Sequence, residues 1–164
     1  MMRRSSWFTR RHDRMNHKTI SLAAFTVAGI SVRTSNDRPQ EIGALWQRFY
    51  AESIAANIPN KKSENIYSVY IDYEGDHTKP YTLVIGGEVS DVSSLPTGLI
   101  SKTVPAAKYA VISANGKQPD SVIAAWHSVY NSDLARTYSG DFDLYVSRGS
   151  GPQGLDVNLY VAIR

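Results

Sequence analysis

Two acidic residues lie inside apolar, strand-like sequence: Asp143 in DFDLYV and Glu88 in VIGGEVS. An isolated carboxylate is costly to bury, so each acid must face solvent, pair within the protein or receive a cation. Because side chains alternate along a strand, Asp143 and Tyr145 point to the same face. We therefore expect an aromatic side chain beside the Asp143 carboxyl group.

Aromatic residues are frequent in the same segments. Tyrosine joins a large apolar ring to a polar hydroxyl, so a cluster of tyrosines can line a pocket for a flat, hydrophobic or cationic molecule. The alternative is that most of them are ordinary core or surface residues of a sheet. The strand tyrosines are Tyr67, Tyr70, Tyr73, Tyr81, Tyr145 and Tyr160.

The remaining reactive groups form no known catalytic or metal-binding pattern. The acidic segment DYEGDH (72–77) lacks the ligand spacing of a calcium loop and has no second histidine nearby, so we expect solvated turn residues. His127 is expected to be a surface or boundary residue rather than a catalytic base. The chain has no cysteine, which excludes thiol nucleophiles, disulfides and thiolate metal sites. It also lacks GxSxG, HExxH, P-loop and GxGxxG motifs, and we predict no catalytic residue, metal or cofactor.

The chain contains an internal repeat. Trp46 and Tyr50 lie four residues apart, and Trp126 and Tyr130 repeat this pair at an offset of 80. The strand-like runs correspond at an offset of 76, IYSVY with FDLYV and YTLVI with VNLYV. Two halves too small to bury their own apolar faces would share one core around an approximate two-fold axis. Such an axis often encloses a cleft, where we expect the functional site.

The first half predicts a strand, a helix and a hairpin. The strand runs from about Thr19 to Thr34, and the hairpin joins IYSVYIDYEG to YTLVIGGEVS through the loop 75–80. The helix starts in EIGALWQRFYAESIA and is ended by the Pro59 segment. Its apolar stripe consists of Ile42, Leu45, Trp46, Phe49 and Ile54.

The second half repeats this order. Its entry strand runs from Gly98 to Ser113 with a break near Pro105, and Asp120 or Ser121 caps a helix that ends near Ser132. The strands DFDLYVS and LDVNLYVAI follow, separated by the hairpin loop RGSGPQG. The predicted fold class is α+β, with duplicated βαββ repeats related by pseudo-two-fold symmetry, antiparallel-rich sheets and two helices around a central cleft.

The basic charge of the chain is concentrated at its start. Residues 1–18 carry six Lys or Arg residues and one Asp, a net charge of +5, which leaves residues 19–164 at −2. The globular part therefore does not suggest a positive groove for nucleic acid. We expect 1–18 to be a disordered leader, although contact with nucleic acid or an anionic surface is the alternative. The domain follows at 19–164, with repeats at about 19–92 and 98–164.

The segment TISLAAFTVAGISV, which follows the basic leader, imitates the core of a signal peptide. It is interrupted by Thr, Ser and Gly, is too short to span a bilayer, and alternates as a strand does. Strand formation is therefore favoured over secretion. We expect a cytoplasmic protein without a membrane partner.

Taken together, these segments resemble the GyrI-like effector-binding family, the small-molecule module of many AraC-type and MerR-type regulators. The resemblance covers about residues 18–164 and includes stand-alone members carried on mobile bacterial cassettes. It implies two βαββ repeats around a cleft. The matching stretches, in family order, are VAGISVRTS, IGALWQRFYAE, IYSVYIDYEGDHTKPYTLVIGGEV, VPAAKYAVISANG, AAWHSVY, DFDLYV and VNLYVAIR.

In drug-binding members of this family, an acid in an F-E-x-Y motif reaches into the cleft and attracts hydrophobic cations. Here the motif is FDLY, so the resemblance gives Asp143 this role with a side chain one methylene shorter, and Glu88 is a substitute. The predicted ligand-binding residues are Asp143, Glu88, Tyr145, Tyr67, Trp46, Phe49, Tyr81, Tyr160 and Trp126.

The expected function is therefore binding of amphipathic, cationic small organic molecules by a sensor or sequestering protein. No helix-turn-helix precedes the domain, so regulation of transcription would need a protein partner, and the domain is not expected to bind DNA directly. One alternative is a hydrolase on the same fold, with Asp143 or Glu88 as base or nucleophile and Tyr145 as proton donor. The other is a protein-binding module similar to gyrase inhibitors.

Overall fold

The computed structural model describes residues 16–146 and 156–164. The loop RGSGPQG and most of the predicted leader 1–18 lie outside the described residues. The fold class is confirmed as α+β, although a short third helix was not predicted. The described elements are β1 (Lys18–Leu22), β2 (Phe25–Thr34), α2 (Pro39–Ala51), α3 (Ile54–Asn57), β3 (Ile66–Ile71), β4 (Tyr81–Val89), β5 (Ile100–Val104), β6 (Ala107–Ser113), α4 (Asp120–Tyr130), β7 (Asp141–Val146) and β8 (Asp156–Ile163).

All eight described strands form one antiparallel sheet in the order β1-β6-β8-β7-β3-β4-β2-β5. The order divides into two equivalent halves, β1-β6-β8-β7 and β3-β4-β2-β5, which meet where β7 pairs with β3. Repeat one consists of β2, α2, β3 and β4, and repeat two consists of β6, α4, β7 and β8. The predicted duplication is therefore confirmed, and the pseudo-two-fold axis passes between β3 and β7.

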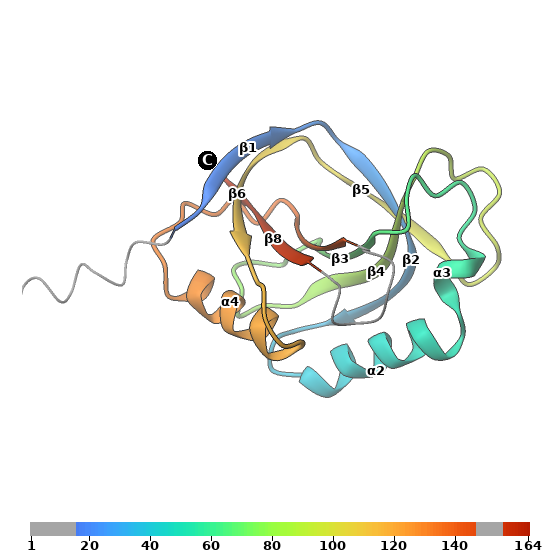
Figure 1. Cartoon of the computed structure of the whole chain (residues 1–164), viewed down its shortest axis with the longest axis horizontal. Helices are drawn as coiled ribbons and strands as arrows, with labels where there is room; N and C mark the ends of the chain where they lie inside the picture. Colours follow the sequence, from blue (N-terminus) through green and yellow to red (C-terminus); the bar gives the residue numbers. More distant parts are fainter. Residues whose placement is uncertain (1–15, 147–155) are drawn as a thin grey trace, which may run out of the picture.

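Each half also receives a strand from the other. β1 pairs with β6 of repeat two, and β5 pairs with β2 of repeat one. The connections from β1 to β2 and from β5 to β6 therefore cross from one half to the other above the sheet (Figure 1). The predicted single strand Thr19–Thr34 is therefore wrong, because the chain leaves one half and enters the other at Ala23 and Ala24. The break predicted near Pro105 is present between β5 and β6.

The offset between the two repeats in the central strands is one residue smaller than the offset of 76 that the sequence suggested. β3 and β7 are both six residues long, and they begin at Ile66 and Asp141, 75 residues apart. Because side chains alternate in a strand, a slip of one residue reverses the face that is compared. At the corrected offset the counterpart of Asp143 is Ser68, which is also its direct pairing partner. Asp143 therefore lies at the pseudo-two-fold axis.

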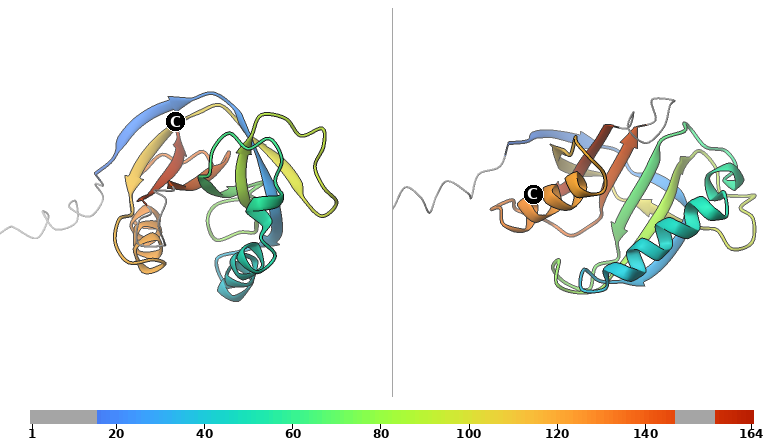
Figure 2. Two further views of the ribbon diagram at one scale, coloured as in Figure 1. Left: turned by 45° about the vertical axis from the view of Figure 1, so that its right-hand side comes forward. Right: turned by 60° about the horizontal axis from the view of Figure 1, so that its bottom comes forward.

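The helices α2 and α4 lie on the same side of the sheet (Figure 2). α2 buries Leu45 and Phe49 as the stripe predicts, but it ends at Ala51. Ser53 then has a left-handed backbone with φ of 51°, which ends the regular helical path, and Ile54 opens the separate helix α3. The prediction of one helix through Ile54 is therefore wrong.

The predicted cap of the second helix is also wrong. The N-cap of α4 is Pro119, which makes no side-chain cap hydrogen bond, and Asp120 is the first helical residue. The hydroxyl of Ser121 is buried and has no hydrogen-bond partner among the described residues. The sequence signal was misplaced because Asp120 and Ser121 lie inside the first turn, where helix dipole interactions rather than capping apply. Inside the described segments, no helix is long and apolar enough to cross a bilayer.

Both faces of the sheet are apolar. On the helix face, α2 packs over repeat one through residues such as Phe49 and Leu83, and α4 packs over repeat two through Trp126 and Leu159. On the opposite face, a third cluster is formed around Tyr109 and Phe142 and is enclosed by the crossing segments of β1 and β5. The central strands are therefore covered on both sides, which explains why their sequence has no simple apolar–polar alternation.

Two glycines allow β2 and β4 to approach closely. A Cβ atom at Gly86 would lie 1.9 Å from the Ala28 carbonyl oxygen, and one at Gly29 would lie 2.0 Å from the Ile85 carbonyl oxygen. Both obstacles are backbone atoms of the paired strand. An alanine at either position therefore requires separation of the strands that carry repeat one.

We predict that Gly86→Ala lowers the free energy of unfolding by about 2 kcal/mol or more, because a backbone clash inside a sheet cannot relax locally. Gly43→Ala is the matched control, since its Cβ would meet nothing within 4 Å in α2. It should stabilise the protein by about 0.5 to 1 kcal/mol through helix propensity. Urea unfolding followed by circular dichroism measures both, and equal stability of Gly86→Ala and wild type would contradict the packing.

Candidate functional site

The Asp143 carboxyl group lies fully buried at the centre of the sheet, with an exposed fraction of 0%. It accepts a hydrogen bond of 2.7 Å from the Tyr70 hydroxyl and one of 2.9 Å from Trp126 Nε1. Tyr70 belongs to β3 of repeat one, and Trp126 belongs to α4 of repeat two. Each repeat therefore contributes one neutral donor to the same acid.

Burial raises the pKa of Asp143 to about 7, and the nearby Asp141 charge acts in the same direction. The hydrogen bonds from Tyr70 and Trp126 lower this pKa but do not offset the desolvation. Among the ion pairs of residues 16–146 and 156–164, none involves Asp143. Asp143 is therefore an acid that a cation or a proton can neutralise near neutral pH.

Asp141 is equally buried but has a different environment. Its carboxylate receives Arg136 Nη2 at 2.8 Å, the Tyr73 hydroxyl at 2.7 Å and the Ala162 amide at 2.7 Å. An ion pair and two further hydrogen bonds therefore hold Asp141 as a structural carboxylate. Burial strongly raises the pKa of Tyr73, and the Asp141 charge adds to the effect, so this hydroxyl stays a donor.

Aromatic rings surround the two donors of Asp143. The Tyr70 ring lies edge to face with Trp126 at 5.2 Å between centroids and with Tyr81 at 5.6 Å. On the side of α2, Trp46 packs edge to face against Tyr145 of β7 at 5.2 Å and against Phe49 at 6.0 Å. Aromatic side chains from both repeats therefore surround the acid and its donors, and we call them the aromatic wall.

A small cavity of about 10 Å³ adjoins Tyr70 and Trp126. A space of this size holds on the order of one water molecule. We call it the central cavity; its lining residues are Asn36, Tyr70, Tyr73, His77, Tyr81, Trp126, Tyr130 and Arg136. The cavity therefore borders both donors of Asp143, and the carboxyl group itself is not among its lining residues.

Contacts between the two repeats close one end of the central cavity. The His77 ring stacks on Tyr130 at 4.5 Å between centroids. Asn36 donates to the Tyr130 hydroxyl and to the His77 carbonyl, both at 3.0 Å, and accepts from the Tyr81 hydroxyl at 2.8 Å. These contacts join the β2–α2 loop, the β3–β4 loop and α4.

The structure separates the nine predicted ligand-binding residues into two groups. Six lie on the helix face around the acid: Asp143, Tyr145, Trp46, Phe49, Tyr81 and Trp126. The other three, Glu88, Tyr67 and Tyr160, lie on the opposite face. The register shows this, because Tyr67 pairs with Leu144 and Tyr160 pairs with Phe142, the two residues that flank Asp143 along β7.

Glu88 has its own partners on that opposite face. It accepts a hydrogen bond of 3.0 Å from the Tyr67 hydroxyl and forms an ion pair of 3.4 Å with Lys62. The sheet lies between Glu88 and Asp143, so the two acids do not share one site. A substitution at Asp143 cannot be compensated by Glu88 without a change in fold.

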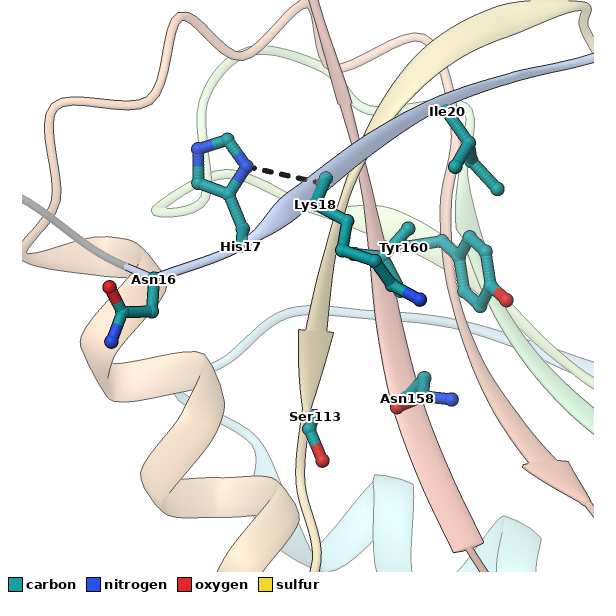
Figure 3. A pocket seen from close by; sticks show the side chains of 8 residues that line it. Asn16, His17, Lys18, Ile20, Ser113, Asn158 and Tyr160 are labelled. Atoms are coloured by element: carbon teal, nitrogen blue, oxygen red, sulfur yellow. Dashed lines mark hydrogen bonds between the residues drawn. The ribbon is translucent and has the colours of Figure 1, made fainter.

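A second hollow of about 590 Å³ lies on the face that carries Tyr160 (Figure 3). Lys18 of β1 and Asn158 of β8 border it together with Tyr160. The Asp143 carboxyl group is on the other side of the sheet. Tyr160 therefore belongs to the surroundings of this hollow rather than to the central cavity.

The acidic segment 72–77 makes surface and loop contacts. Asp72 pairs with Lys102 at 2.7 Å, and Glu74 pairs with Arg33 at 2.8 Å. In the part of the chain that the structure describes, no three His, Asp or Glu side chains gather in a way that could hold a metal ion. His77 instead packs at the edge of the central cavity, a position that the sequence did not suggest.

Several residues of the site were missed in the sequence, and Asp141 and Arg136 are the two charged ones with buried contacts. Asp141 could have been found, because it lies two residues before Asp143 and so shares its face. Arg136 carried no signal, since it precedes β7 in a loop and reaches Asp141 only through the tertiary fold. Tyr70 was among the strand tyrosines but could not be distinguished from its neighbours without the register.

Comparison with known proteins identifies the family. The chain belongs to the Cass2 family of integron-associated effector binding proteins, whose model matches residues 20–163. YobU of Bacillus subtilis strain 168, named a candidate transcriptional regulator, is 32% identical over 147 residues, which cover 84% of this chain and 91% of YobU.

Two solved structures share the fold. An integron cassette protein from the mobile metagenome of Vibrio cholerae, VCH_CASS2, is 28% identical with a TM-score of 0.72, over 90% of this chain and 95% of its own. SAV2435, solved with tetraphenylphosphonium bound, is 21% identical with a TM-score of 0.75, over 92% of this chain and 94% of its own. At that identity, the likeness to SAV2435 concerns the fold alone.

The raised pKa of Asp143 predicts a pH-dependent stability. The pKa of Asp143 is about 7 in the folded protein and 3.8 in the unfolded chain, so the folded state binds the proton more tightly. The free energy of unfolding that this proton contributes is fully present below pH 3.8 and is lost as pH rises through 7. Asp143→Asn keeps an acceptor for Trp126 and a donor for the Tyr70 hydroxyl. We expect this variant to be more stable than wild type by about 2 to 4 kcal/mol at pH 8, with little difference at pH 4.5.

Urea unfolding at several pH values measures this difference. The exposed Asp133 provides the control, because Asp133→Asn should follow wild type at every pH. Parallel stability curves for Asp143→Asn and wild type would show that Asp143 titrates as an ordinary carboxyl group.

Proposed function

We propose that the protein binds amphipathic aromatic cations in an enlarged form of the central cavity, with Asp143 as the recognising acid. The observation that carries the proposal is a fully buried carboxyl group that, among the described residues, is held only by neutral donors and is surrounded by aromatic rings. The proposed binding unit is residues 19–164, and its binding residues are Asp143, Tyr70, Tyr81, Trp126, Tyr145 and Trp46.

The energetics of the site support a cation. A buried carboxylate without a basic partner is destabilising, and a bound cation removes this penalty while a neutral molecule does not. Aromatic rings add cation–π attraction of roughly 0.5 to 2 kcal/mol per contact. Large apolar substituents on the cation gain further free energy by burial against the rings. A hydrophobic cation therefore satisfies the charge and the surface of this site together.

Entry of such a ligand requires the aromatic wall to open, because the central cavity has a volume of only about 10 Å³. The Tyr130–His77 stack and the Asn36 hydrogen bonds lie at one end of it. On the other side of the acid, Tyr50 is 60% exposed and stacks on Trp46. We propose that rotation of these side chains, rather than separation of the sheet, makes room for the ligand.

The proposed biological role is that of a ligand sensor or sequestering protein in the cytoplasm. The family description as effector binding proteins supports a response to small molecules.

Tetraphenylphosphonium is a suitable probe, because it is a large aromatic cation and because SAV2435 binds it. Ligand binding requires the ionised form of Asp143, whose pKa is about 7. We therefore predict that affinity falls roughly tenfold for each pH unit below 7 and is level above pH 8. Isothermal titration calorimetry at low salt measures this dependence.

Asp143→Asn should bind tetraphenylphosphonium about 1 to 3 kcal/mol more weakly at pH 8 and without the pH dependence. Asp133→Asn should behave as wild type, since Asp133 is exposed. If wild type and Asp143→Asn bind with equal affinity at pH 8, Asp143 is not the recognising acid.

Hydrolysis is a second candidate function, favoured by one observation. A carboxyl group with a pKa near 7 that contacts a tyrosine hydroxyl has the properties of a general base paired with a proton donor. In this arrangement the donor would be Tyr70 rather than the predicted Tyr145. Mass spectrometry of an ester or epoxide probe after incubation separates the two functions, because a binding protein returns the probe unchanged.

A further inference from the structure

The guanidinium of Arg136 is a buried group with unused hydrogen-bonding capacity. Its side chain is 6% exposed, and Nη2 donates to Asp141 at 2.8 Å. Nε and Nη1 are buried and have no hydrogen-bond partner among residues 16–146 and 156–164. Buried donors without acceptors are rare, since each costs about 1 to 3 kcal/mol. Within the described residues these two donors therefore lack an acceptor, which leaves them available to a bound molecule.

Arg136 is also held in place. Its guanidinium lies over the Tyr138 ring at 4.3 Å and near the Trp126 ring at 5.6 Å. Its partner Asp141 is fixed in turn by the Tyr73 hydroxyl and the Ala162 amide. Rotation toward another acceptor would break the ion pair and both ring contacts, so the free donors keep their present positions.

The Arg136 side chain belongs to the same space as the proposed cation site. Arg136 lines the central cavity together with Tyr70 and Trp126, the two donors of Asp143. Trp126 contacts both groups, since its ring nitrogen donates to Asp143 and its ring face meets Arg136. A molecule in an enlarged cavity would therefore meet a carboxylate and a set of N–H donors.

The chemistry of the expected acceptor follows from the local charges. The charge of Arg136 is already balanced by Asp141, and Asp143 adds a negative charge when ionised. An anionic group would lose its hydration without a net positive charge to replace it. A neutral oxygen acceptor, such as a carbonyl, satisfies the N–H donors at a lower desolvation cost.

We propose that the ligands of this cavity are aromatic cations that also carry a neutral carbonyl oxygen, which accepts hydrogen bonds from Arg136. This inference rests on the proposed function, because it places the cationic part of the ligand at Asp143. Arg136 is then a specificity-determining residue that selects among hydrophobic cations.

Matched triphenylphosphonium probes test this inference with the full chain at pH 8. The 4-oxopentyl and 5-oxohexyl derivatives carry a ketone at two distances from phosphorus, and the pentyl and hexyl derivatives are their controls. We expect at least one ketone to bind about tenfold more tightly than its alkyl control, the size of a hydrogen bond to a charged donor. The 4-carboxybutyl derivative should bind no more tightly than the better ketone.

A variant assigns the gain to Arg136. Arg136→Lys keeps a cation beside Asp141 but removes the planar set of donors, so the ketone advantage should fall to less than about twofold. The ratio of ketone to alkyl affinity is compared within each variant, so a general loss of affinity in Arg136→Lys does not affect the test. Arg33→Lys, a change at an exposed arginine paired with Glu74, should preserve the full ketone advantage.

The outcomes separate the two proposals. If the alkyl probes bind and neither ketone gains affinity in the wild type, the role of Arg136 is refuted and the cation site stands. Tighter binding of the carboxylate than of the ketones would refute the neutral class of acceptor. If none of the probes binds, the proposed function itself fails. Should Arg136→Lys not fold, the wild-type comparison of ketone with alkyl probe still decides.

Discussion

The candidate site depends on one carboxyl group that the two repeats hold between them. Asp143 lies at the centre of the sheet and receives one hydrogen bond from Tyr70 of repeat one and one from Trp126 of repeat two. Both donors are neutral, so the acid is oriented without being neutralised. Aromatic packing around these donors then forms the wall of the central cavity. The site exists only when the two halves are assembled.

The two repeats provide equivalent strands around this site, and the site has its acid because the repeats differ at one pair of equivalent positions. The positions of Ser68 and Asp143 correspond in the two repeats and pair directly across the axis. Paired side chains in a sheet lie close together, and two carboxylates there would repel each other. One acid opposite a small hydroxyl avoids this repulsion. Ser68 is also buried, so the hydroxyl stands opposite the acid inside the sheet.

The sequence predicted those features that depend on local periodicity. The repeated Trp and Tyr spacing predicted two equivalent helices, and strand alternation placed Asp143 with Tyr145. It could not place Glu88, because β4 is covered on both faces and its residues show no alternation. It could not find Arg136 either, since a loop residue acquires its role only when the chain folds back onto Asp141. The offset error of one residue arose because aromatic residues occur on both faces of β3 and β7.

The central claim is that Asp143 is a buried acid that titrates near neutral pH and whose ionised form is stabilised by a bound cation. Carbon-13 NMR of the aspartate carboxyl groups measures this directly, with the signal assigned by its loss in Asp143→Asn. The account predicts a titration midpoint near pH 7 in the free protein and a shift to lower pH on addition of tetraphenylphosphonium. A midpoint near pH 4 that the cation leaves unchanged would contradict it.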